Sequence, residues 1–192
     1  ALAAAVQRPD DICGLILVAV ETLQEGEPRN NFLKRALTWD GAGALKGARH
    51  ITMAGHYAYI AANAGIVSVN LDTPLKPTVT GVLPLDGARA SMLQFRYLFV
   101  TDRTGLRVVD VTLPERARFV AHVPLAVARR VFVARTYAYV AAGREGLVIV
   151  DVENPEAPRV FGKFDADGKL TDAHDVTIGT TTGSAIRTST YG

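Results

Sequence analysis

The strongest constraint on the fold of this chain is an internal repeat with a spacing of 40 residues. Three segments alternate aromatic and apolar side chains at that interval, at 57–60, 97–100 and 137–140. A glycine follows each of them and opens an apolar run, and a proline follows each run. Repeats of this length are typical of propeller blades or solenoids.

The composition of each unit favours strands over helices. Short stretches rich in Val, Ile and Tyr alternate with Gly, Asn, Asp or Pro, which is the pattern of strands and tight turns. In the third unit we expect four strands, at 129–134, 137–141, 146–152 and 159–164. Four strands in about 40 residues make one propeller blade, so the predicted fold is an all-β protein built from β-propeller blades of four antiparallel strands.

The third unit also resembles a known repeat. Residues 146–158 contain Leu-Val-Ile-Val-Asp and are similar to the LVIVD repeat, a bacterial and archaeal propeller repeat named for that pentapeptide. Residues 105–111 are similar, whereas residues 65–71 carry Asn70 in place of the aspartate. The resemblance implies a propeller and a periplasmic, cell-surface or secreted location. It supplies no catalytic residues to transfer.

The repeats divide the chain into about three complete blades and two partial ones. We expect complete blades at 47–86, 87–126 and 127–172, the last with an acidic insertion. Residues 1–46 are expected to hold a degenerate or partial blade with an insert, and residues 173–192 the start of a truncated blade, poorly structured from 180 onward. Because propellers close with four to eight blades, we expect the chain to form part of a larger or multi-chain propeller.

One polar position recurs at the start of the first expected strand of each unit, directly after an alanine. Arg49, Arg89 and Arg129 share it, and His174 follows in the next copy. If these strands line a central channel, the side chains converge on its mouth, where arginine forks could bind an anionic group. The alternative is that each arginine pairs with a carboxylate of an adjacent blade, with these candidates: Asp102, Asp110 and Asp175.

Other recurring residues have structural interpretations. Asn70, Asp110 and Asp151 end the apolar runs, where such side chains accept hydrogen bonds from the following backbone and stabilise turns. The tyrosines at the repeat start are expected to pack between blades: Tyr57, Tyr97 and Tyr137. The acidic insertion offers a weak calcium candidate, although its spacing does not match an EF-hand: Asp165, Asp167 and Asp172.

Composition excludes several classes of function. Lys and Arg total 21 against 19 Asp and Glu, for a net charge of +2, which argues against a strongly electrostatic nucleic-acid binder. The single cysteine, Cys13, excludes an internal disulfide framework and a cysteine-rich zinc fold. The longest apolar run, at 12–20, is too short to span a bilayer as a helix. Motifs for nucleophilic, zinc-protease or phosphate-loop chemistry are missing from the sequence, so no cofactor is predicted.

These observations favour a non-enzymatic protein-interaction scaffold, whose partner is another protein or further propeller blades. Two alternatives stay open. One is a ligand-binding or catalytic propeller domain that uses the arginine-lined channel mouth for a small anion. The other is a subunit of an extracytoplasmic redox or surface assembly, which rests on the family resemblance alone.

Overall fold

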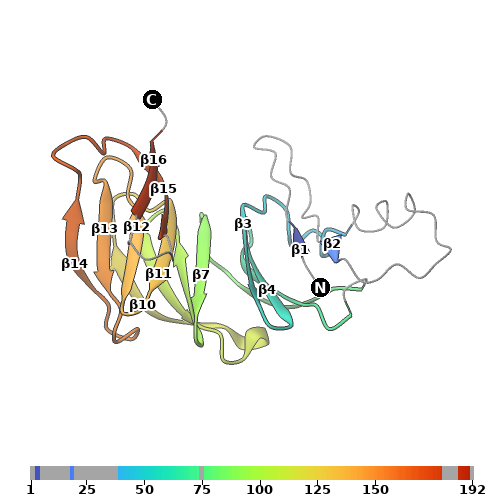
Figure 1. The fold of residues 1–192 in the computed structure, drawn as a ribbon. Helices are drawn as coiled ribbons and strands as arrows, with labels where there is room; N and C mark the ends of the chain where they lie inside the picture. Colours follow the sequence, from blue (N-terminus) through green and yellow to red (C-terminus); the bar gives the residue numbers. More distant parts are fainter. Residues whose placement is uncertain (1–2, 5–17, 20–38, 74–75, 179–185, 191–192) are drawn as a thin grey trace.

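The computed structural model describes residues 3–4, 18–19, 39–73, 76–178 and 186–190 (Figure 1). Within them lie three four-stranded antiparallel sheets and two strand pairs, which confirms the predicted all-β fold with four-stranded antiparallel blades. The partial blade predicted at 1–46 falls largely outside the described residues. Its described part includes the pairing of β1 (Ala3–Ala4) with β2 (Val18–Ala19). No helix in the described part of the chain is long and apolar enough to cross a membrane.

Each four-stranded sheet is a simple meander in which neighbours in sequence are neighbours in space. Blade 1 consists of β3 (His50–Ala54), β4 (Tyr57–Ala62), β5 (Gly65–Asn70) and β6 (Thr78–Leu83). Blade 2 consists of β7 (Ala90–Gln94), β8 (Tyr97–Thr101), β9 (Gly105–Asp110) and β10 (Arg118–Pro124), with the 3-10 helix η1 (Pro114–Arg116) before its last strand. Blade 3 consists of β11 (Arg130–Ala134), β12 (Tyr137–Ala141), β13 (Leu147–Asp151) and β14 (Arg159–Phe164), so the predicted strands of this unit are confirmed to within a residue at each end.

A glycine begins the third strand of blades 1 and 2 and directly precedes that of blade 3, because a side chain would not fit there. Gly65, Gly105 and Gly146 have φ of +119°, +142° and +70°, which side chains rarely adopt. A Cβ would lie 2.1 Å from the carbonyl oxygen of Leu83 at Gly65 and 2.1 Å from that of Val123 at Gly105. The recurring glycine therefore lets the backbones of the third and fourth strands approach closely.

The fourth strand of every blade contains a β-bulge at the same place. The register with the third strand shifts between Val79 and Gly81 in β6, between Phe119 and Ala121 in β10, and between Val160 and Gly162 in β14. These registers make Leu83, Val123 and Phe164 equivalent residues, each opposite the first apolar residue of its third strand.

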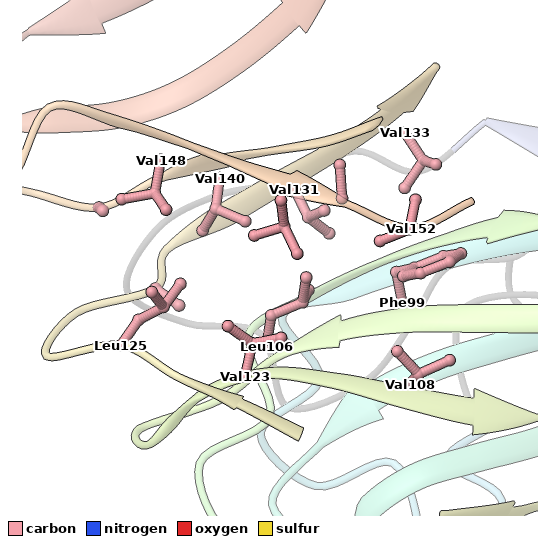
Figure 2. Close-up of a cluster of buried hydrophobic side chains, with 14 residues drawn as sticks. Phe99, Leu106, Val108, Val123, Leu125, Val131, Val133, Val140, Val148 and Val152 are labelled. Atoms are coloured by element: carbon pink, nitrogen blue, oxygen red, sulfur yellow. The ribbon is translucent and has the colours of Figure 1, made fainter. Parts of the chain in front are cut away.

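Successive blades pack face to face through apolar side chains. Figure 2 shows the contact between blades 2 and 3, where Val131, Val140 and Val148 face Leu106 and Val108. This cluster contains 14 buried residues, the most of any cluster among the described residues. Since each buried Val or Leu contributes about 1.5–3 kcal/mol, such contacts hold the array together. A second cluster joins blades 1 and 2 in the same way, around Ile66, Leu98 and Val109.

The array continues past blade 3 with two strands, β15 (Ala173–Ile178) and β16 (Ile186–Thr190), paired antiparallel. Residues 186–190, which belong to the segment expected to be poorly structured, form β16 in this pairing. β15 lies against β11 and β12, where Val176 and Ala173 pack on Leu147 and Ala141.

Candidate functional site

The first strands of the four units gather around one hollow. β3, β7, β11 and β15 are neighbours in that order, and residues from all four line a hollow of about 380 Å³. These are the strands expected to line the channel of a propeller. The predicted anion-binding residues precede them in sequence by one position, at Arg49, Arg89 and Arg129, whereas His174 lies within β15.

The three arginines at the repeated position, Arg49, Arg89 and Arg129 (the arginine row), each contact the next unit of the chain. Arg49 Nη1 donates to the carbonyl oxygen of Ala88, at 3.5 Å, and Arg89 Nη1 donates to that of Ala128, at 3.3 Å. Each acceptor precedes the next arginine of the row. These hydrogen bonds join neighbouring blades at their inner edges, so the position has a structural use in blades 1 and 2.

The last arginine of the row, Arg129, contacts a carboxylate instead of a backbone carbonyl. Arg129 Nη2 lies 2.8 Å from Asp172 Oδ1, and Arg129 Nη1 also contacts His174 Nε2. His174 Nε2 lies 2.8 Å from the other Asp172 oxygen. These contacts, with His174 first and Arg129 second, hold the pKa of the Asp172 carboxyl below its usual value. The arrangement places Arg129, Asp172 and His174 together, and anion binding by this row stays a prediction.

The carboxylates expected to pair with this row pair with other arginines. Asp102 is 1% exposed and binds Arg107 Nε at 2.8 Å, while Asp175 lies 3.1 Å from Arg130 Nε. Asp110 pairs with Arg118. Arg118 lies opposite Asp110 in the register of β9 and β10, and Arg107 lies in the strand that follows Asp102, whereas Arg130 reaches Asp175 from the neighbouring sheet. The repeat spacing alone does not reveal these pairings.

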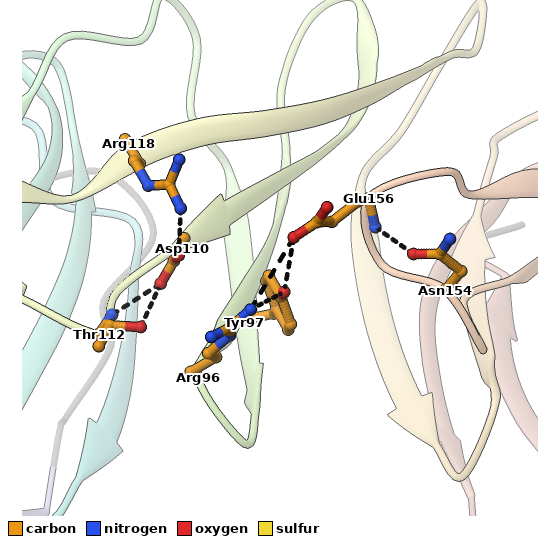
Figure 3. Close-up of polar contacts among 7 residues, drawn as sticks. All are labelled: Arg96, Tyr97, Asp110, Thr112, Arg118, Asn154 and Glu156. Carbon is orange, nitrogen blue, oxygen red and sulfur yellow. Dashed lines mark hydrogen bonds and ion pairs between the residues drawn. The ribbon is translucent and has the colours of Figure 1, made fainter.

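The turn residues hold the loop that follows each third strand. The Oδ1 atoms of Asn70, Asp110 and Asp151 accept the backbone N–H two residues later, at 2.7, 2.9 and 3.0 Å. Figure 3 shows Asp110 with Thr112 and Arg118. Hydrogen bonds from the Thr112 side chain and backbone lower the pKa of Asp110.

Blade 1 differs from blades 2 and 3 in two linked positions: it lacks the aspartate at the end of the third strand, and it lacks the arginine that pairs with that aspartate. Asp110 and Asp151 each pair with an arginine that opens the fourth strand, Arg118 at 2.9 Å and Arg159 at 3.0 Å. In blade 1 the residue opposite Asn70 is Thr78. The carboxylate is thus present in the two blades where an arginine faces it, and the amide makes the same turn contact without charge.

The recurring tyrosines are partly buried at the blade flanks. Tyr57 packs on the cluster between blades 1 and 2, and Tyr97 on the cluster between blades 2 and 3. The hydroxyl of Tyr97 also donates to Glu156 of blade 3 at 3.2 Å (Figure 3). Tyr137 contacts Phe161 edge to face, with ring centroids 5.2 Å apart.

The acidic insertion does not assemble a metal site in this part of the chain. Across the described ranges, no three His, Cys, Asp or Glu side chains form a group that could hold a metal ion, and this includes Asp165, Asp167 and Asp172. Cys13 lies outside the described residues.

Sequence reasoning named Asp175 as a partner for the arginines but did not predict that it lines a hollow with His50 and Arg130. His50, Arg130 and Asp175 occupy equivalent positions of three inner strands, and Ala90 occupies the fourth. Because the residue type changes from copy to copy, self-comparison of the repeats gives no signal there. Only the close approach of the inner strands brings them together.

The fold and this site define an array of blade-like antiparallel sheets whose first strands surround a shared hollow. The comparison with known families agrees: the model of the LVIVD repeat matches residues 47–77 and 127–166, so these segments are similar to LVIVD repeats. Blade 2 forms the same four-stranded sheet between the two matched segments. No curated protein matches the chain.

Proposed function

We propose that this chain is a non-enzymatic protein-interaction scaffold, and that the outer half of blade 3 binds a partner protein. One observation carries the proposal: Phe161 and Phe164 of β14 are 66% and 55% exposed. Large apolar side chains that gather on one exposed sheet face commonly mark an interaction site.

The equivalent face of blade 2 is covered. Val123 corresponds to Phe164 and is 3% exposed, and Val120, which corresponds to Phe161, packs on the cluster formed with blade 3. In blade 1, Leu83 packs likewise on the cluster formed with blade 2. The face that carries Phe161 and Phe164 is therefore equivalent to the faces of blades 1 and 2 that a neighbouring sheet covers.

The way in which blade 3 covers the equivalent face of blade 2 indicates the chemistry of the partner. Blade 3 covers blade 2 with a sheet face of Val and Ala side chains, including Val131, Ala138 and Val140. We therefore expect the partner to be another protein that presents an antiparallel β-sheet face rich in Val, Leu and Ala. β15 already covers the inner half of this side of blade 3, so the partner extends an existing interface outward.

A photocrosslinking experiment tests this proposal. A benzophenone amino acid is placed at residue 161 in cells that produce the protein, and the crosslinked peptide is identified by mass spectrometry. The matched control carries the same group at Phe95 of blade 2, which is 91% exposed in the turn between β7 and β8.

We expect crosslinks from residue 161 to one apolar, strand-forming segment of another protein, and we expect Phe164→Ser to reduce them strongly. The control position should give no such product. Crosslinks that join only two copies of this chain would contradict the proposed partner, as would identical products from residues 161 and 95.

A further inference from the structure

The hollow between the inner strands contains hydrogen-bonding groups that the fold does not use. His50 of β3, Arg130 of β11 and Asp175 of β15 all line it, so three different sheets contribute. Its volume, about 380 Å³, lies within the range of small-molecule sites. The hollow lies at the inner strands, whereas Phe161 and Phe164 lie on an outermost strand, so this inference does not rest on the proposed partner site.

The orientation of His50 fixes where its proton is. Its Nδ1 accepts the backbone N–H of Ser91 at 3.1 Å, so the neutral ring carries its proton on Nε2. Burial, followed by the positive charge of Arg130, lowers the pKa of His50 to about 4. At neutral pH, His50 therefore offers one N–H donor, and no hydrogen bond among the described residues uses it.

Arg130 offers a second and larger set of donors. Its Nε lies 3.1 Å from Asp175 Oδ1, which also accepts the backbone N–H of Val176 at 2.8 Å. Apart from this ion pair, no hydrogen bond within the described part of the chain engages Nη1 or Nη2 of Arg130. Asp175 is 52% exposed, so water can solvate its carboxylate if a ligand occupies the arginine fork.

We propose that this hollow binds a small organic carboxylate. The carboxylate accepts paired hydrogen bonds from the Arg130 guanidinium, whose planar fork matches the two oxygens. The Nε2–H of His50 completes the donor set, and Met92 and Phe132 provide apolar surface for the rest of the ligand. A neutral ligand of the same shape lacks the charge and the second acceptor oxygen, and it binds more weakly.

The test is an NMR titration of the whole chain with sodium benzoate, which carries one carboxylate and an apolar ring. We expect saturable shifts of the Arg130 Nε–H and His50 ring signals. Benzamide, the neutral analogue, and sodium chloride at equal ionic strength should give neither. No shift of either signal over the titration, or equal shifts with benzamide, would overturn the proposal.

Two variants locate the binding independently. Arg130→Gln removes the fork, and Thr177→Trp fills the hollow from β15 while keeping both proposed donors, Arg130 and His50. Each should weaken benzoate binding at least tenfold, whereas Arg116→Gln in η1 should not. If Arg130→Gln does not fold, Thr177→Trp still decides the matter, because unchanged affinity in it would contradict binding in the hollow.

Discussion

Blades 2 and 3 have the same strand order and the same bulge, yet they differ in the exposure of the sheet face that each turns toward the next unit of the chain. Val123 of blade 2 is 3% exposed, while its equivalent in blade 3, Phe164, is 55% exposed. The difference does not come from the strands themselves, since the larger and more apolar side chain is the exposed one. It comes from the neighbour: blade 3 covers blade 2, and β15 covers only the inner half of blade 3. In a repeat array, burial is therefore a property of each interface between units.

The strongest test of this comparison places a charged side chain at each of the two equivalent positions, Val123 and Phe164, in separate variants. Val123→Asp buries a carboxylate in the contact between blades 2 and 3, which should destabilise the protein by about 3 kcal/mol or more. Phe164→Asp should change the free energy of unfolding by less than about 1 kcal/mol, because its site is half exposed. Urea denaturation of both variants measures the difference, and equal losses of stability would contradict it.

Acid should weaken the covered contact between blades 1 and 2. His50 lies there against Ser91, and its pKa in the folded protein is about 4, below the 6.5 of an ordinary histidine. The unfolded chain therefore binds this proton first as the pH falls. Stability should decrease between about pH 6.5 and pH 4, by up to about 3 kcal/mol in total, and show no further loss from this group below that range.

The measurement is the free energy of unfolding across that pH range for the natural protein and for His50→Gln. The variant should lack this part of the acid response. A slope in the variant that matches the natural protein would assign the response to other groups.

A smaller effect comes from two equivalent glycines. A Cβ at Gly81 would lie 2.9 Å from the carbonyl oxygen of Glu115, because blade 2 packs on blade 1 there, whereas a Cβ at Gly162 would meet open space. Gly81→Ala should therefore cost about 1 kcal/mol, and Gly162→Ala should be neutral or stabilise by up to about 1 kcal/mol. Thermal unfolding of the two variants compares them, and a loss at Gly162 as large as that at Gly81 would show that its face is covered.

The repeat spacing predicted the blades well because strands and turns are local features. The alternation of apolar residues and the glycine at Gly146 placed the strands of blade 3 to within a residue at each end. The site was harder to predict. The partner of Arg129 is Asp172, in the insertion that breaks the period, and the equivalents of His50 share no residue type. Contacts between blades depend on how sheets approach one another, and a comparison of repeats along one chain carries little of that information.

The bulge shared by β6, β10 and β14 limits how this protein can associate. A fourth strand that carries an extra residue cannot offer a continuous row of backbone donors and acceptors to an incoming strand. Fibril-like growth through the outer rims is thereby discouraged, even though β14 exposes two phenylalanines. Any assembly built on blade 3 must then form by face-to-face packing of side chains and not by strand pairing at the sheet edge. Such packing allows a stoichiometric complex and disfavours an open-ended polymer.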